Sequence, residues 1–297
     1  MTIPLREHVP LAPLTSWRVG GPARYFLEPT SREDLKWALG WAHEQSLPFF
    51  VIGKGSNLLV SDEGFDGLII RLGERMGSVS WEDDLVRADA GGATSTLVKS
   101  AAKEDRGGLE FLSTIPGTVG GVVFMNAGAH GASVSDWLES AEVLFPDGRI
   151  LSQSPQDLAY AYRSSNLRAR GGIVLSAKFR TVARPKEIIQ KTISELARWR
   201  RERQPQGLSS GSVFTNPPGD SAGRLIEAAG LKGLTIGRAQ VSPVHANFFV
   251  NLGGASASDL QLLIQEVQEK VHAVFGLWLH PEVQGVGAPV GRTEALH

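Results

Sequence analysis

The 297-residue chain contains no cysteine. Disulfides, thiolate metal sites and thiol nucleophiles are therefore excluded, and the absence agrees with the reducing environment of the cytoplasm. Histidine also offers little metal-binding capacity, because the seven residues are scattered and the single His43-Glu44 pair lacks the second histidine of a zinc-binding helix. We therefore expect a cytoplasmic protein that holds no metal.

An excess of charge and long apolar runs are missing as well. The 30 Lys and Arg residues nearly balance 31 Asp and Glu residues, so no broad cationic field is available for nucleic acid or an anionic membrane. No segment reaches the roughly 18 apolar residues of a membrane span. The first 14 residues carry Arg6, Glu7 and three prolines, where a secretory signal needs an uninterrupted apolar stretch. We expect a soluble monomer whose partner is a small molecule, without nucleic acid or membrane partners.

Glycine, in contrast, is abundant, with 34 residues, and seven clusters of paired or nearly paired glycines lie in the first 172 residues. Such clusters are typical of strands and loops that approach one another closely. A Ser31-x-x-Asp34 capping signal opens a predicted helix. Along this half we expect a strand near 25–28, a helix over 32–45, a buried strand over 48–52, a strand over 68–72, a strand pair over 79–90, a helix over 94–103 and a hairpin turn at 146–148.

The pattern changes after about residue 182. Pro185 suits the first turn of a connecting helix that ends near Arg203, and the stretch 204–220 is rich in Pro, Gly and Ser. A further amphipathic helix is predicted over 258–275, with a core stripe of Leu260, Leu263, Ile264, Val267, Val271 and Val274. These changes predict two lobes over 13–74 and 75–182, a connecting helix over 183–203 and a C-terminal domain over 204–297.

Two glycine-rich segments carry candidate chemistry. In the first, the strand that ends at Ile52 opens into Gly53-Lys54-Gly55-Ser56-Asn57-Leu58, where bare amides can approach a phosphate. Leu58 stands where a Rossmann fingerprint needs glycine, and Gly55 follows Lys54 where a Walker motif needs Ser or Thr. Taken alone, this segment is equally well a plain tight turn. The second glycine-rich system lies over 115–121 and 125–129. Together the two systems form a pair of cradles, which suits a diphosphate-bridged dinucleotide.

The order of these motifs resembles the FAD-binding fold of the vanillyl-alcohol-oxidase (PCMH) type, and more closely the UDP-N-acetylenolpyruvoylglucosamine reductase family. The resemblance runs from Thr15 to near Glu282 and includes the segments 15–23, 90–92, 161–165, 211–217 and 280–283. It implies an α+β protein with a two-lobed FAD-binding region and a C-terminal α+β substrate-binding domain. The chain lacks the additional segment that carries a mobile tyrosine in the longer form of the family, and so resembles the shorter, type II form.

The resemblance implies NADPH-dependent, FAD-mediated reduction of UDP-N-acetylglucosamine enolpyruvate to UDP-N-acetylmuramate. This reaction belongs to peptidoglycan precursor synthesis, and thus to cell-wall formation, cell shape and division. FAD is expected to be bound noncovalently, and the absence of cysteine excludes a flavin joined through that residue. Two alternatives stay open: a flavin oxidase of the same fold, and a nucleotide-sugar binding protein without catalytic activity.

Three catalytic residues are implied by the resemblance. Arg163 can hold the substrate carboxylate by two hydrogen bonds and stabilise charge as that group becomes enolate-like. Glu282 is its implied partner. Ser212 is the implied proton donor to C2, where a carbanion-like, strongly basic acceptor offsets the high pKa of a hydroxyl.

The remaining implied contacts involve the cofactor and the UDP-sugar. The FAD-binding residues are Ile52, Gly53, Lys54, Gly55, Ser56, Asn57, Leu58, Gly91, Ile115, Pro116, Gly117, Thr118, Gly120, Gly121, Gly128 and Ile173. The substrate-binding residues are Tyr162, Arg203, Asn216 and His245. The sequence departs from the family at Thr215, where lysine is usual, and at Thr114, where glycine is common; the first departure puts one cationic contact in doubt.

Overall fold

The computed structural model describes residues 4–292, which form two compact units built from interleaved segments. The first unit contains Leu27–Lys54 and Ile69–Arg200, preceded by residues 4 and 5. The second contains Arg6–Phe26, Gly55–Leu68 and the described part of Arg201–His297. The last five residues of the predicted C-terminal domain lie outside the described chain.

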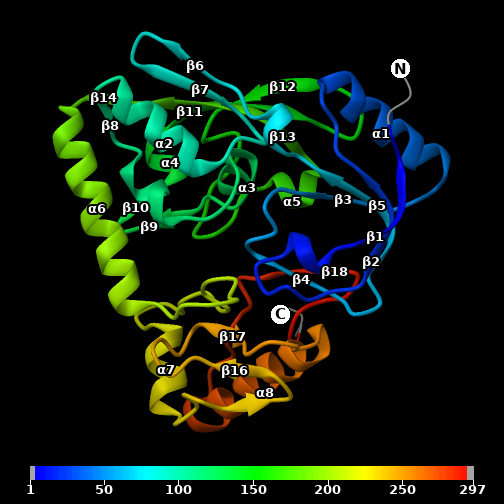
Figure 1. The fold of residues 1–297 in the computed structure, drawn as a ribbon, viewed down its shortest axis with the longest axis vertical. Helices are drawn as coiled ribbons and strands as arrows, with labels where there is room; N and C mark the ends of the chain where they lie inside the picture. The colour runs from blue at the N-terminus through cyan, green and yellow to red at the C-terminus, as the bar shows by residue number, and fades with distance from the viewer. Residues whose placement is uncertain (1–3, 293–297) are drawn as a thin grey trace. The chain divides into compact units, whose positions relative to one another are not determined.

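A five-stranded sheet forms the centre of the first unit (Figure 1). Every neighbouring pair of strands in this sheet is antiparallel. The predicted hairpin at 146–148 is confirmed: it joins β11 to β12, and the Gly148 amide donates to the Phe145 oxygen within the turn. The strands, in spatial order, are β12 (Ile150–Gln153), β11 (Leu138–Leu144), β13 (Ile173–Arg180), β7 (Leu85–Asp89) and β6 (Val79–Glu82).

Local sequence signals explain where the helices of this unit begin. Ser31 caps its helix through the Asp34 amide, and the Asp34 carboxylate closes the capping box, as predicted. The helices are α1 (Arg32–Glu44), α2 (Thr94–Lys103), α3 (Val119–Phe124), α4 (Val134–Trp137), α5 (Leu167–Arg170) and α6 (Lys186–Arg203), of which α6 runs into the second unit. The remaining strands are β3 (Phe49–Ile52), β8 (Arg106–Gly107), β9 (Gly128–Ala129), β10 (Ala132–Ser133) and β14 (Val182–Ala183).

The second unit combines the segment Arg6–Phe26 with the described residues from Arg201 onward and with Gly55–Leu68. Its strands pair as β1 (Arg6–Pro10) with β2 (Pro22–Leu27), as β4 (Leu58–Val60) with β18 (Gln284–Val286), and as the sheet β15 (Thr235–Ile236), β16 (Ala239–Val241) and β17 (Phe249–Asn251). The pair β4 and β18 is parallel. Its helices are α7 (Ala222–Ala228) and α8 (Ala257–Phe275), and β5 (Phe65–Arg71) continues into the first unit.

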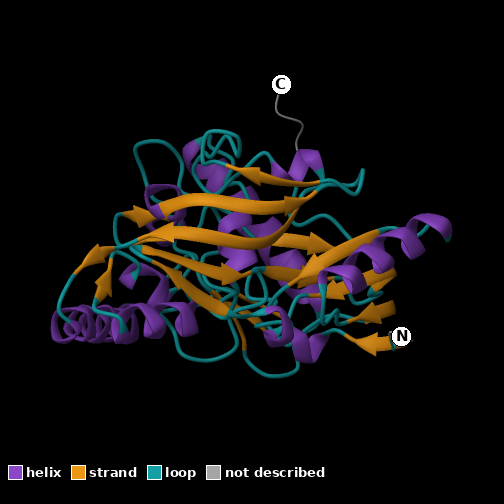
Figure 2. Cartoon of the chain, turned by 90° about the horizontal axis from the view of Figure 1, so that it is seen from above, coloured by secondary structure: helices purple, strands orange, loops and turns teal. Residues whose placement is uncertain are grey.

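Helices and strands both occur throughout the described chain, as the colours of Figure 2 show. Helix α8 supplies much of the core of the second unit. The predicted stripe is buried from Leu260 to Val271, but Val274 is 60% exposed, so its inclusion in the core was wrong. The last helical turn therefore lies beyond the packed face. The carboxylate of Asp62 accepts from the amides of Ala257 and Ser258, each at 2.8 Å, and so fastens the 55–68 segment to the start of α8.

One further expectation needs correction. The strand β3 is not fully buried, because Phe49 at its start is 37% exposed and only Ile52 at its end is buried. The connecting helix predicted to end near Arg203 is present as α6, and it buries only Ile189 among its residues. Helix α6 is thus a largely solvated element.

Candidate active site

The two glycine-rich systems meet inside the first unit. A Cβ atom at Gly53, just after β3, would lie 2.4 Å from the Oγ1 atom of Thr118 and 2.9 Å from its Cγ2 atom. Only glycine permits this approach, because real Cβ atoms do not come so close to another side chain. The strand end and the loop before α3 therefore present adjoining main chain with few side chains, which fits a bound dinucleotide.

The second glycine loop is held by the segment before α2. Hydrogen bonds run from the Val119 amide to the Gly92 oxygen at 2.8 Å and from the Gly120 amide to the Ala90 oxygen at 2.9 Å. The Gly121 amide donates to the Thr118 hydroxyl at 3.4 Å. Gly120 and Gly121 were expected to bind FAD, and their amides already donate within the chain. In this structure these two amides are therefore used within the chain and are not left as donors for a ligand.

The other residues assigned to FAD fall in both units. In the first unit lie Ile52, Gly53, Lys54, Gly91, Ile115, Pro116, Gly117, Thr118, Gly120, Gly121, Gly128 and Ile173. In the second lie Gly55, Ser56, Asn57 and Leu58. Asn57, assigned to FAD, contacts a residue expected to be catalytic: the Nδ2 atom of Asn57 donates to the main-chain oxygen of Glu282 at 3.0 Å.

Arg163 occupies a tight two-residue turn in the first unit. Ala161 and Ser164 exchange both main-chain hydrogen bonds, at 3.1 and 3.2 Å, and Arg163 between them has a φ of 55°. This left-handed conformation is uncommon for a residue with a side chain, and strained residues of this kind cluster at functional sites. The guanidinium lies 5.2 Å from the centre of the Tyr162 ring, and a Cβ atom at Gly128 would lie 3.1 Å from its Nη1 atom. The turn sets where the Arg163 side chain leaves the main chain, and the absence of a side chain at Gly128 leaves room for its guanidinium.

Ser212 and Glu282 are brought together in the second unit. The main chain of Val213, next to Ser212, accepts from the Glu282 amide at 2.8 Å. On its other side Ser212 forms an isolated β-bridge with Phe248. Residues far apart in sequence are thus placed on adjacent extended segments, and Arg163 belongs to the other unit.

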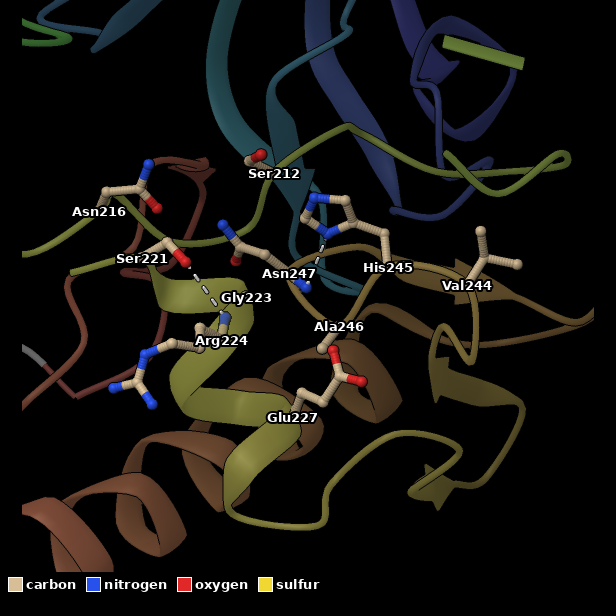
Figure 3. Close-up of a pocket in the computed structure, with 10 residues that line it drawn as sticks. All are labelled: Ser212, Asn216, Ser221, Gly223, Arg224, Glu227, Val244, His245, Ala246 and Asn247. Carbon is tan, nitrogen blue, oxygen red and sulfur yellow. Dashed lines mark hydrogen bonds between the residues drawn. The ribbon is translucent and has the colours of Figure 1, made fainter. Parts of the chain in front are cut away.

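An open pocket of about 350 Å³ lies beside Ser212 in the second unit. Two residues assigned to the substrate, Asn216 and His245, line it (Figure 3). The Oδ1 atom of Asn216 accepts from the Ala222 amide at 3.0 Å, so Asn216 is held at the start of α7. The other lining residues, which the sequence did not indicate, are Ser221, Gly223, Arg224, Glu227, Val244, Ala246 and Asn247.

His245 is held in one tautomer. Its Nδ1 atom accepts from the Asn247 amide at 3.2 Å, as the dashed line in Figure 3 marks, and its ring packs 4.7 Å from the ring of Phe248. Burial lowers the pKa of the imidazole, because desolvation penalises the charged form. A neutral ring with an acceptor at Nδ1 carries its proton on Nε2. His245 is therefore equipped as a hydrogen-bond donor.

The structure also shows the surroundings of the other two residues assigned to the substrate and of the two threonines that depart from the family pattern. Tyr162 is 57% exposed in the first unit, and Arg203 ion-pairs with the neighbouring Glu202 at 3.3 Å in the second. The amide of Thr215 donates to the His280 oxygen at 2.9 Å, and its hydroxyl donates to the same oxygen at 3.2 Å. The main-chain oxygen of Thr114 accepts from the guanidinium of Arg200 at 2.6 Å. Both threonines thus take part in local structure.

Comparison with known proteins agrees with this arrangement. Residues 23–154 match a family model described as an FAD binding domain, and residues 204–286 match one described as the C-terminal domain of UDP-N-acetylenolpyruvoylglucosamine reductase. The fold and the paired loops thus define an FAD-binding oxidoreductase with an additional C-terminal domain, as the sequence predicted.

Relatives of similar length narrow the class further. Proteins named UDP-N-acetylenolpyruvoylglucosamine reductase from Prochlorococcus marinus and Rubrobacter xylanophilus are 49% and 44% identical, covering 94% of this chain in each case and 92% and 94% of the relatives. The crystal structure of the enzyme of that name from Thermus caldophilus has a TM-score of 0.82 at 40% identity, covering 96% of this chain and 99% of that one. The chain belongs to the UDP-N-acetylenolpyruvoylglucosamine reductase family. It is accordingly an oxidoreductase of peptidoglycan precursor synthesis, and the flavin oxidase and the inactive binding protein are set aside.

No helix among residues 4–292 is long and apolar enough to cross a membrane. Over the same described range, no group of three or more His, Asp or Glu side chains is arranged to hold a metal ion.

Proposed function

We propose that the chain reduces the enolpyruvyl ether of a UDP-sugar with NADPH, and that Arg163, Glu282 and Ser212 carry the reaction. When bound, FAD supplies the hydride chemistry, accepting a hydride from NADPH and passing it to C3 of the enolpyruvyl group. Gly53 and the loop ending at Gly121 would hold the cofactor. The observation that best supports the proposal is that the extended segment carrying Ser212, which lines an open polar pocket, lies beside the main chain of Glu282.

Arg163 has the geometry for the carboxylate of the substrate. A planar guanidinium offers two parallel donors, which match a carboxylate and strengthen as negative charge grows on it. Because Arg163 lies in a constrained turn, its main chain loses less conformational entropy when the guanidinium pairs with the carboxylate. Glu282 would donate to the enolic oxygen in its protonated form.

Ser212 would transfer its proton to C2 after hydride has reached C3. Its hydroxyl is half-buried and lines the pocket (Figure 3). The neutral His245 and the amide of Asn216, on the same pocket, would bind the phosphates or uracil of the UDP-sugar as hydrogen-bond donors. These roles would place the sugar nucleotide along the side chains between Asn216 and His245.

The decisive experiment separates the two half-reactions by stopped-flow absorbance of the flavin. Ser212→Ala is expected to leave flavin reduction by NADPH unchanged and to slow oxidation by the enolpyruvyl substrate by about a hundred- to ten-thousand-fold, the usual contribution of general acid catalysis. Ser212→Cys, with a more acidic donor, should regain part of the rate. Ser80→Ala, at an exposed serine on β6, is the control, and its reduced flavin should be oxidised by the substrate within about threefold of the wild-type rate. If Ser212→Ala were oxidised by the substrate at a rate within about threefold of wild type, C2 would be protonated by water or another group.

A further inference from the structure

Asn247 is a buried polar residue in an apolar segment. It is 3% exposed, and it lies between Ala246 and Phe248, which are also buried. An amide is desolvated at such a position only if its groups are hydrogen-bonded. Both polar groups of the Asn247 side chain bond to the main chain of Phe214. The Oδ1 atom accepts from the Phe214 amide at 3.0 Å, and the Nδ2 atom donates to the Phe214 oxygen at 2.8 Å.

These bonds replace a strand partner for the segment that carries Ser212. The segment belongs to no regular sheet and forms only two isolated bridges, from Ser212 to Phe248 and from Phe214 to Pro281. The main chain of Asn247 adds a third bond, from the Val213 amide to its oxygen at 2.8 Å. One residue thus binds two consecutive residues after Ser212, through its main chain and its side chain.

Asn247 is itself held from the opposite side. Its amide donates to the Nδ1 atom of His245, and the amides of His245 and Val244 donate to the buried hydroxyl of Ser242 at 3.3 and 3.1 Å. These three bonds order the turn from Ser242 to Asn247, and with it the main chain of Asn247. The same turn also places His245 on the pocket.

We propose that Asn247 is a positioning residue for the proton transfer from Ser212: its side-chain amide fixes the main chain of Phe214, and through it the place of the Ser212 hydroxyl. This inference rests on the proposed function for the chemistry, while the structural part stands apart from it. A displacement of about 1 Å at a reacting group costs on the order of a hundredfold in rate. Loss of the amide is therefore expected to slow proton transfer without removing the donor.

Three variants separate the groups involved. Asn247→Ala leaves the Phe214 amide and oxygen without their partners, while Asn247→Asp keeps an acceptor and loses the donor unless the carboxyl is protonated. Asn251→Ala is the matched control, because Asn251 is another buried asparagine of the second unit whose Nδ2 donates to a main-chain oxygen, that of Trp17, at 2.8 Å. It makes no side-chain bond to the Ser212 segment among those described.

The first measurement needs no substrate. Hydrogen exchange of the holoenzyme, followed by mass spectrometry of a peptide containing residues 212–215, reports whether the segment is held. We expect at least tenfold faster exchange in this peptide for Asn247→Ala, and exchange at the wild-type rate for Asn251→Ala in folded protein. Wild-type protection in Asn247→Ala would overturn the proposal whatever the reaction catalysed.

The second measurement uses the two half-reactions. For Asn247→Ala we expect flavin reduction by NADPH within about twofold of wild type and oxidation by the enolpyruvyl substrate about 10- to 100-fold slower, with an unchanged half-saturating substrate concentration. Asn247→Asp should recover rate as the pH is lowered, since the protonated carboxyl regains the donor. In a Ser212→Ala background the added effect of Asn247→Ala should be far smaller than in wild type.

Three results contradict the proposal: equal slowing of both half-reactions, a raised half-saturating concentration at an unchanged rate, or a full multiplicative effect in the Ser212→Ala background. The second of these would identify Asn247 as a substrate contact. If the wild-type flavin is not oxidised by the substrate at all, the proposed function fails, and the exchange measurement still decides the structural claim.

Discussion

The indole nitrogen of Trp17 donates to the main-chain oxygen of Phe249 at 2.8 Å, across 232 residues of sequence. Both side chains are fully buried in the core of the second unit. The Nδ2 atom of Asn251, two residues after Phe249, donates in return to the main-chain oxygen of Trp17 at 2.8 Å. The segment Arg6–Phe26 is therefore built into the unit that carries Ser212 and Glu282.

Trp17→Phe tests that connection. The substitution keeps an aromatic ring and removes the donor, so the buried oxygen of Phe249 loses its partner, at a cost of about 1 to 3 kcal/mol in the free energy of unfolding, with further loss from the smaller ring. Trp37→Phe is the control, since Trp37 is 44% exposed on α1. Chemical denaturation of the two variants should show a loss for the first and little change for the second. An equal effect would mean that the Trp17 bond adds no stability.

Gly53→Ala tests the proposed flavin cradle. The new methyl group would collide with the Thr118 side chain, whose Oγ1 atom is 2.4 Å from the Cβ position, and so push the two loops apart. We expect a folded protein with much less FAD, measured by the absorbance ratio of flavin to protein after purification. Thr118→Ala removes the colliding atoms beyond Cβ, so the double variant should regain flavin. Full occupancy in Gly53→Ala alone would contradict the close approach.

Arg163→Lys keeps the charge and removes the planar pair of donors. Oxidation of reduced enzyme by the enolpyruvyl substrate is expected to slow by about tenfold or more, since a bidentate contact to a developing charge is lost, while reduction by NADPH stays near the wild-type rate. Arg168→Lys, on the exposed helix α5, is the control. Stopped-flow traces of both half-reactions provide the measurement. If both slow equally, Arg163 supports the flavin or the fold instead.

Glu142 links stability to pH in the first unit. Hydrogen bonding from Arg32, and further bonds from Ser176 and Arg87, lower the pKa of its carboxyl from 4.5 to about 2 against the opposing effect of burial. Because the pKa in the folded state is depressed, the stabilisation is present above about pH 4.5 and is lost as the pH falls toward 2. Glu142→Gln should therefore be less stable than wild type at pH 7.

The comparison of thermal or urea unfolding at pH 7 and near pH 3 provides the check, and the gap between wild type and Glu142→Gln should narrow at the lower pH. Glu139→Gln removes a partner of an exposed ion pair, with Arg180 at 3.1 Å, and should change stability little at either pH. A gap that stays constant with pH would show that Glu142 stabilises through packing instead of charge.

The sequence by itself determined features that depend on neighbouring residues. The Ser31–Asp34 capping box, the hairpin turn at Gly148 and the buried stripe of α8 all follow from short spacings that act on the main chain nearby. The ordered glycine motifs likewise indicated an FAD-binding reductase, because each motif is a continuous segment. The stripe failed only at Val274, since periodicity does not reveal where a packing partner ends.

Only the tertiary structure decided which distant segments share a unit. The bonds from Asn57 to Glu282 and from Asn247 to Phe214 join residues 225 and 33 positions apart, and neither pair carries a local signature. The sequence offered one signal for Asn247, a polar residue inside an apolar stretch, and this signal does not indicate which residue it bonds to. Such contacts depend on how the chain folds back on itself, so the residue that holds Ser212 in place became visible only when the segments were seen side by side.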